Sequence, residues 1–248
     1  GNPLATPSTV GTTAGAVLGA LAAVVLLGGG TVAGVPVLAL AAFAGALLVT
    51  LVVAMVASSG RASTSDVLLA GIAITLAASA LASGLQFQAD MAATFQAVRW
   101  SLGHLGQLGF EGAWTLAPFA LVTVAVVLSQ TRALDAMVAG DSLAQTQGVD
   151  VIRVRTLVLG VGALGVGATV ALCGPIAFVG LIVPHLVRLW LTASRRVLLP
   201  MSALLGASLL VLCDGLARVV IPGRELPVGV LTAALGAPLL LWLVVRRR

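Results

Sequence analysis

Residues 174–190 read GPIAFVGLIVPHLVRLW, and this stretch decides the fold. Apart from His185 and Arg188 its residues are apolar, small or proline, as in a helix that crosses a membrane. Four residues that disfavour a regular helix interrupt it: Gly174, Pro175, Gly180 and Pro184. Each proline removes a backbone donor and crowds the preceding turn. In lipid the carbonyls freed in this way need protein or water as partners. We therefore predict a short, bent membrane helix that is buried among other helices.

The composition places the whole chain in the membrane class. Of 248 residues, 60% are hydrophobic and only 8% are charged, and the mean hydropathy is +1.16. A soluble domain has about 25% charged residues, because its surface faces water. So low a charge content excludes a soluble globular protein.

Eight apolar segments are about long enough to cross a bilayer. A span needs roughly 20 residues, since about 30 Å of hydrocarbon is crossed at about 1.5 Å per residue. The segments are 8–27, 35–57, 67–87, 113–128, 154–172, 176–190, 198–219 and 227–245. We predict an all-α fold, in which residues 1–248 form a single domain: a polytopic transmembrane helical bundle of about eight spans.

The arginines predict the orientation of these spans. All 13 basic residues are arginine, and the formal net charge is +5. With eight crossings, ten arginines fall on the side of both termini: Arg61, Arg132, Arg153, Arg155, Arg188, Arg195, Arg196, Arg246, Arg247 and Arg248. The three on the other side are Arg99, Arg218 and Arg224. Basic residues favour cytoplasmic loops, so we expect a multi-pass protein of the cell membrane with both ends in the cytoplasm. The arginines stand singly or in short groups, so we expect no nucleic-acid partner.

The polar loop 133–150 carries an apolar pattern of its own. It predicts short helices broken at Gly140 and ended at Gly148, with Asp141 as the N-cap of the second helix. Four apolar residues would then form a ridge: Leu134, Met137, Val138 and Leu143. Such a ridge fits either a protein partner or the surface of the bilayer.

Two polar regions are predicted on the outer side. Loop 88–112 contains Arg99, Trp100 and His104, which fits an interfacial helix anchored by Trp or a lip around a pore entrance. Further along, Asp214 and Arg218 are four residues apart and face each other on one helical stripe. They form either an intrahelical ion pair or a place where a carboxylate of a docking protein binds. Arg224 and Glu225 add a second charged pair beside them.

The cysteines and histidines give little indication of a metal site or a disulfide. Cys173 and Cys213 lie inside apolar segments without ligand spacing, so we expect them to be small core residues. His185 has no second His or Cys at ligand spacing, so a helix cap or an interhelical hydrogen bond is favoured over a metal or proton site. The chain opens with GNPLATP, which lacks an initiator Met and a signal-like segment, so we expect a portion of a longer protein.

Several motifs follow one another along the chain: GNPLATPSTVGTTAGA (1–16), STSDVLLAGIA (63–73), GDSLAQTQGVDV (140–151), GPIAFVGLIVPHLVRL (174–189), RVLLPMSALLGASLL (196–210) and ELPVGVLTAALGAP (225–238). In this order they resemble the iron-siderophore, haem and cobalamin permease family of ABC importers. The resemblance covers essentially the whole chain and is most specific in the last three motifs. It implies a homodimer of ten-span subunits with the translocation passage at the interface, of which the first two spans would be missing here.

The resemblance also assigns roles to residues. It implies a cytoplasmic gate at Thr64 and Ser65, and docking of an extracytoplasmic substrate-binding protein at Arg218, to which we add Arg224. It implies a coupling helix that contacts the ATP-binding subunit, formed by Gly140, Asp141, Ser142, Leu143, Ala144, Gln145 and Gly148. The family usually has Gly-Glu at the start of that helix, where this chain has Gly140-Asp141.

The implied function is uptake of an iron-siderophore complex, with haem or cobalamin as further cargoes. The chain has no GxxxxGK[ST] motif, so we expect it to be no enzyme and to bind no cofactor, while ATP and Mg²⁺ are bound by the partner subunit. A secondary transporter is an alternative, but the span centres lack the ionisable groups that couple ions. An intramembrane enzyme is another, but no HExxH, GxSxG or paired carboxylates occur in a span.

Overall fold

The computed structural model describes residues 11–28, 30–32, 35–58, 64–105, 109–191, 194–222 and 225–246. Within these ranges the regular structure is helical, except for two antiparallel two-residue strands, β1 (Thr31–Val32) and β2 (Val35–Pro36). The helices are α1 (Thr12–Leu27), α2 (Val37–Ser58), α3 (Thr64–Gln88), α4 (Met91–Ser101), α5 (Gly109–Ser129), α6 (Thr131–Ala136), the 3₁₀ helix η1 (Met137–Ala139), α7 (Asp141–Thr146), α8 (Val151–Cys173), α9 (Val179–Trp190), α10 (Arg195–Val219) and α11 (Val228–Arg246). The all-α prediction is confirmed.

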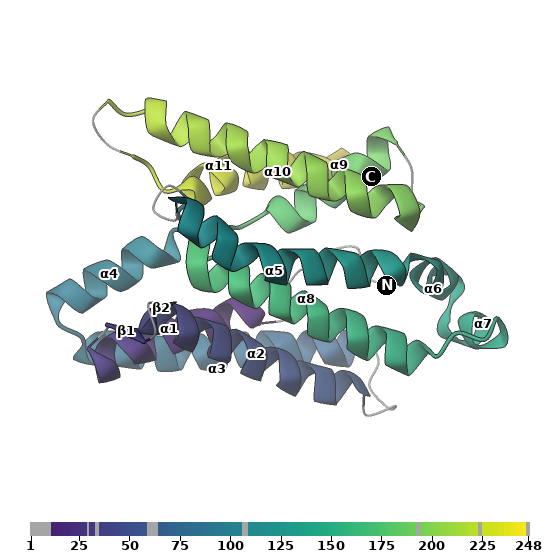
Figure 1. Ribbon diagram of the computed structural model, residues 1–248, viewed down its shortest axis with the longest axis horizontal. Helices are drawn as coiled ribbons and strands as arrows, with labels where there is room; N and C mark the ends of the chain where they lie inside the picture. The colour runs from purple at the N-terminus through teal and green to yellow at the C-terminus, as the bar shows by residue number, and fades with distance from the viewer. Residues whose placement is uncertain are drawn as a thin grey trace.

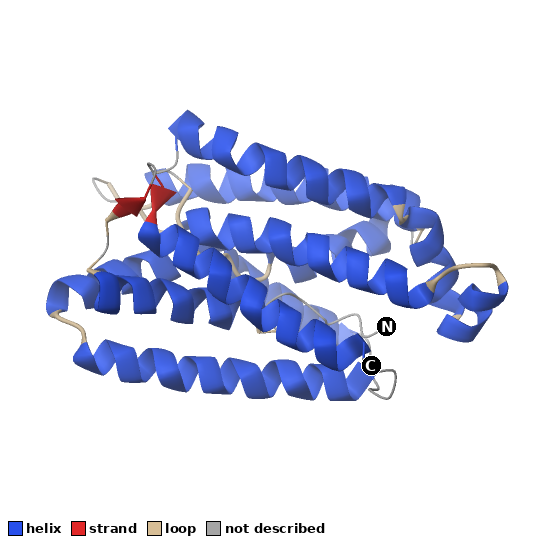
Figure 2. Cartoon of the chain, turned by 60° about the horizontal axis from the view of Figure 1, so that its bottom comes forward, coloured by secondary structure: helices blue, strands red, loops and turns tan. Residues whose placement is uncertain are grey.

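The long helices run side by side in two groups (Figure 1). Helices α1, α2, α3 and α8 pack together with α5 against α8, while α9, α10 and α11 form the second group. The pieces α6, η1 and α7 lie at one end of the bundle, which we call the α7 end. Helix α4 and the strands lie at the opposite end, the α4 end (Figures 1 and 2).

Small residues let α1 and α2 approach each other closely. A Cβ added at Gly15, Gly19 or Gly45 would collide with the backbone of the facing helix. The buried cluster around this contact consists mostly of alanines and extends to Val170 and Ala171 of α8. Lipid supplies no hydrophobic drive between helices, so close backbone packing of this kind stabilises a membrane bundle.

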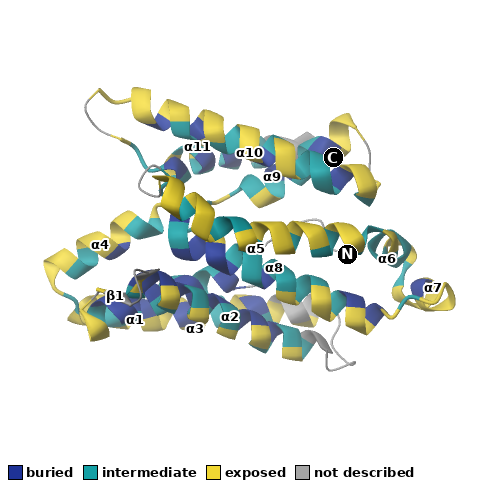
Figure 3. Cartoon of the chain, viewed as in Figure 1, coloured by how far each residue is buried: buried dark blue, intermediate teal, exposed yellow. Residues whose placement is uncertain are grey.

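Eight apolar helices of the described ranges correspond to the eight predicted segments. Five are long and apolar enough to cross a membrane, namely α2, α3, α5, α8 and α10, and three are shorter, namely α1, α9 and α11. The apolar residues of α5 and of the outer face of α10 are largely exposed (Figure 3), as expected of helices that face lipid. The number of crossings itself stays a prediction.

The two ends of the bundle carry the arginines that the sequence assigns to opposite sides. Six of the ten lie in or beside the elements that meet at the α7 end: Arg132, Arg153, Arg155, Arg188, Arg195 and Arg196. At the α4 end are Arg99, in the last turn of α4, and Arg218, in the last turn of α10. Arg246 is the last residue of α11, and four arginines lie outside the described residues: Arg61, Arg224, Arg247 and Arg248. Which end faces the cytoplasm stays a prediction.

Candidate functional site

The segment between α5 and α8 folds into three short helical pieces at the α7 end (Figure 1). Between η1 and α7, Gly140 has φ 120° and ψ 152°, a conformation that is essentially restricted to glycine. This residue lets the chain change direction before α7 begins at Asp141. The predicted break at Gly140 is therefore confirmed, and α7 ends at Thr146, just before Gly148.

The start of α7 differs from the prediction in one respect. The sequence predicts Asp141 as the N-cap, but Gly140 holds that position and Asp141 is the first helical residue. Its carboxylate accepts a hydrogen bond from Nη2 of Arg155 at 2.8 Å and does not cap the backbone. The two side chains are 52% and 41% exposed, so this ion pair contributes only about 0–1 kcal/mol to stability. It nevertheless connects α7 to the first turns of α8.

Helix α7 presents most of its side chains to solvent. Leu143 is 53% exposed, and Ser142 and Gln145 are exposed beside it, while Ala144 is fully buried and holds the helix against the protein. Val138 in η1 is 64% exposed. Of the predicted ridge, then, Val138 and Leu143 are exposed, and the other two members, Leu134 and Met137, are half-buried. We call Val138, Ser142, Leu143 and Gln145 the α7 surface.

A second polar contact connects this segment to the membrane helices, and sequence reasoning missed it. Asp135 at the end of α6 accepts a hydrogen bond through Oδ1 from the backbone N–H of Arg195 at 3.1 Å. Arg195 and Arg196 open α10, whose first turn contains no acidic residue. The N-terminus of a helix favours negative charge, but Arg195 and Arg196 place positive charge there. That imbalance is the signal that a carboxylate from elsewhere is needed there.

At the α4 end, Arg218 forms the ion pair predicted from its spacing. Its Nε donates to Oδ2 of Asp214 at 2.9 Å, and Nη1 lies 4.0 Å from Oε1 of Glu225. The Arg218 side chain is 47% exposed, so the guanidinium retains donors that face solvent. The prediction for Arg224 lies outside the described residues.

The gate prediction falls at the start of α3. Thr64 is the first residue of this helix and Ser65 the second. The gate role of these two residues stays a prediction.

Gly174 lies at the break between α8 and α9. Gly174 has φ 72° and ψ 175°, a conformation almost restricted to glycine. A Cβ at this position would also collide with the carbonyl oxygen of Trp100, in the last turn of α4. One residue earlier, the carbonyl of Cys173 accepts a hydrogen bond from the backbone N–H of His104 at 2.7 Å. The break thus fits against the end of α4.

The other three helix-disfavouring residues of the stretch 174–190 lie in two places. Pro175 belongs with Gly174 to the non-helical segment, whereas Gly180 and Pro184 lie inside α9. His185 follows Pro184 in the same helix. A bend of α9 at Gly180 or Pro184 stays a prediction.

A cavity of about 530 Å³ lies beside the break, between α5, α8 and the start of α9. Its wall is mostly apolar, and its polar side chains are Thr13, Thr123 and Thr169. Thr123 donates to the carbonyl of Val161 at 3.1 Å, and Thr169 to that of Gly165 at 2.8 Å. No ionisable side chain lines this cavity, so its described wall has no group that could carry a proton.

The described residues contain no group of three or more His, Cys, Asp or Glu side chains placed to hold a metal ion. Cys173 and Cys213 are free thiols, and both are buried, as the sequence predicts for core residues.

The sequence pattern of the FecCD transport family matches residues 1–246. The chain belongs to the FecCD transport family. It is 38% identical over 246 residues to the vitamin B12 import system permease protein BtuC of Salmonella paratyphi A, covering 99% of this chain and 74% of that protein. The BtuC of Vibrio cholerae serotype O1 is 40% identical over 250 residues, covering 99% of this chain and 73% of that protein.

A solved structure shows the same fold. It is described as an inward-facing conformation of a metal-chelate type ABC transporter, and it superposes with a TM-score of 0.89 at 29% identity, over 99% of this chain and 77% of that one. The family resemblance inferred from the motifs is thus confirmed. As a FecCD member this chain is a multi-pass membrane permease of an ABC importer, a class whose members work with ATP-binding subunits and a substrate-binding protein.

Proposed function

We propose that this chain is the permease subunit of an importer for a bulky metal chelate, with cobalamin as the first cargo to test. The observation that supports this most strongly is the match of essentially the whole chain to vitamin B12 import permeases at 38–40% identity. The iron-siderophore cargo expected from the sequence, and haem, are the next candidates.

The α7 surface is the proposed contact with the ATP-binding subunit. Its residues are exposed, and Val138 and Leu143 make it partly apolar. A lone exposed helix of six residues is too short to be stable by itself, and burial of Ala144 fixes it to the protein. A movement of the bound ATP-binding subunit would be transmitted to α8 through Asp141 and Arg155, and to α10 through Asp135. The partner subunit binds ATP and Mg²⁺, and this chain positions the passage.

Arg218 is the proposed docking residue for the substrate-binding protein. An arginine can bind a carboxylate through two donors at once, and Arg218 has solvent-facing donors at the end of the bundle opposite α7. Asp214 and Glu225 hold the guanidinium in place before docking. A docking carboxylate would therefore compete with both acidic residues, and we expect contacts elsewhere to supply part of the affinity.

The permease is proposed to act as a homodimer in the cell membrane, with the passage between the two copies. The α7 end would face the cytoplasm, with the predicted gate at Thr64 and Ser65 beside it. Family membership favours this importer over a secondary transporter or an intramembrane enzyme.

The test uses the complete permease in vesicles with its ATP-binding subunit and substrate-binding protein. We expect accumulation of labelled cyanocobalamin that requires ATP on the α7 side and binding protein on the α4 side. Replacing Arg218 by Glu should weaken association of the binding protein while leaving the fold intact. Uptake of an iron-siderophore in place of cobalamin would reject the proposed cargo, and uptake without ATP or without the ATP-binding subunit would reject the importer.

A further inference from the structure

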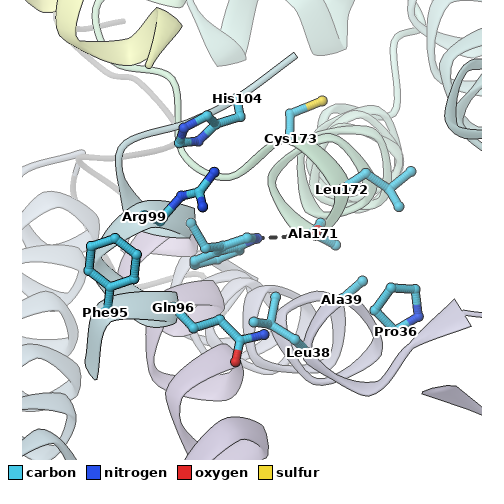
Figure 4. A pocket seen from close by; sticks show the side chains of 11 residues that line it. Pro36, Leu38, Ala39, Phe95, Gln96, Arg99, His104, Ala171, Leu172 and Cys173 are labelled. Carbon is cyan, nitrogen blue, oxygen red and sulfur yellow. Dashed lines mark hydrogen bonds between the residues drawn. The ribbon is translucent and has the colours of Figure 1, made fainter. Parts of the chain in front are cut away.

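A second cavity, of about 430 Å³, lies at the α4 end between α2, α4 and the end of α8 (Figure 4). One part of its wall is apolar, formed by Pro36, Leu38, Ala39 and Leu172. The opposite part carries polar and aromatic side chains: Phe95, Gln96, Arg99, Trp100 and His104. The cavity is therefore amphipathic, with one apolar and one polar wall. The proposed transport mechanism makes no use of it.

The polar wall offers hydrogen-bond donors that have no acceptor. The side chains of Gln96, Arg99 and His104 make no hydrogen bond or ion pair with another described residue. The guanidinium of Arg99 lies 5.9 Å from the ring centre of Phe95, a contact that leaves its N–H groups available. In Figure 4 the Arg99 guanidinium and the His104 ring point to the same part of the pocket.

Two backbone carbonyls beside the pocket already accept hydrogen bonds. The indole Nε1 of Trp100 donates to the carbonyl of Ala171 at 3.4 Å, and the backbone N–H of His104 donates to the carbonyl of Cys173 at 2.7 Å. These contacts satisfy carbonyls at the end of α8, which would otherwise attract a cation. The pocket therefore offers the positive charge of Arg99 and the unpaired N–H donors of Gln96, Arg99 and His104. This combination favours an anion with several oxygen atoms.

The position of the pocket along the apolar helices indicates which molecule carries such an anion. Helix α2 begins at Val37 and α8 ends at Cys173, and both are long apolar helices. The pocket is lined by Leu38 and Leu172, at the outermost turns of these helices. It therefore lies where hydrocarbon meets the headgroup layer, at the level where Trp is enriched. The phosphates of the lipids lie at this level.

We propose that this pocket binds the phosphate group of a glycerophospholipid from the leaflet at the α4 end. Arg99 forms the charge-assisted contact, Gln96 and His104 supply further N–H donors, and the apolar wall at Leu38 and Leu172 receives the first carbons of an acyl chain. The protein environment is consistent with this site. Burial, and then the charge of Arg99, lower the pKa of His104, while Glu225 raises it, so the net shift favours the neutral imidazole.

The experiment is native mass spectrometry of the complete permease, purified in detergent and titrated with phosphatidylglycerol. Wild type should retain the lipid. Replacing Arg99 by Gln should weaken retention roughly tenfold or more, the loss of one charge-assisted hydrogen bond. Arg99→Lys should restore part of the affinity because the charge is kept. The matched control is Arg132→Gln, which removes an exposed arginine at the α7 end and should leave retention unchanged.

Two results would overturn the proposal. Equal retention by wild type and Arg99→Gln would show that lipid binds elsewhere on the apolar surface. A second arm titrates inorganic phosphate and follows thermal unfolding. If inorganic phosphate stabilises wild type but not Arg99→Gln, and phosphatidylglycerol gives no such difference, the ligand is a free phosphate and the lipid is rejected.

Discussion

Replacing Gly174 by Ala tests the geometry of the helix break most sharply. Two costs add at this position. The backbone conformation, φ 72° and ψ 175°, is one that residues with a Cβ avoid at a cost of about 1–3 kcal/mol. The new methyl would also stand well under 3.0 Å from the carbonyl oxygen of Trp100, and forcing extra volume into a packed site costs about 1–3 kcal/mol. The expected loss of stability is therefore about 2–6 kcal/mol.

The neighbouring carbonyl has little freedom to move away. The oxygen of Trp100 already accepts a hydrogen bond from the backbone N–H of Gly103 at 3.1 Å, which fixes the end of α4. Gly180 provides the matched control, because it lies in α9 with no atom within 4 Å of a built Cβ. There an Ala should be neutral or stabilise by about 0.5–1 kcal/mol.

The assay is thermal unfolding of the purified protein in detergent, comparing both variants with wild type. Gly174→Ala should unfold at a clearly lower temperature, and Gly180→Ala at the same or a slightly higher one. Equal behaviour of the two variants would refute the reasoning, since it would show that neither the backbone conformation nor the contact with Trp100 constrains the break.

Three further predictions concern the two ends. Leu143→Asp places a charge on the α7 surface and should abolish transport-linked ATP hydrolysis in the assembled importer; unchanged stimulation by the binding protein would contradict this. Asp135→Ala should lower stability by about 1 kcal/mol by removing the carboxylate at the start of α10, whereas Asp135→Asn keeps an acceptor and most of the stability; thermal unfolding decides, and equal losses would show that the acceptor is not what matters. Burial and Arg99 lower the pKa of His104, so the stability that its neutral imidazole contributes is complete above pH 6.5, the ordinary pKa, and is lost as the pH falls through the lowered pKa. The unfolding temperature should therefore fall with pH in this range, and His104→Gln should reduce that dependence.

Much of the fold could be predicted because apolar length and helix-breaking residues are local signals. The eight apolar segments, the break at Gly140 and the separation of arginines to two ends all depend on residues close together in sequence. A helix, α4, forms within loop 88–112, and Asp90 caps it by accepting from the N–H of Ala93 at 2.7 Å. Such caps follow from a spacing of three residues, which a sequence displays directly.

The rest depends on contacts between residues far apart in sequence. Asp135 and Arg195 are 60 positions apart, and no local pattern pairs them. Gly174 is required by the carbonyl of Trp100, which only the packing of α4 brings near. The N-cap of α7 was assigned wrongly for a different reason. Gly140 and Asp141 are both acceptable caps, and the partner that draws the Asp141 carboxylate away, Arg155, comes from α8.

The orientation of the bundle is the central claim, because it places the α7 surface where an ATP-binding subunit can reach it. Single cysteines introduced at Gln145 and at Glu225 report on it directly, since both residues are exposed and the two native thiols are only 4% and 1% exposed. With a membrane-impermeant maleimide on intact cells, Glu225→Cys should be labelled and Gln145→Cys should be labelled only after the membrane is opened. Labelling of Gln145→Cys in intact cells would place α7 outside and contradict the account.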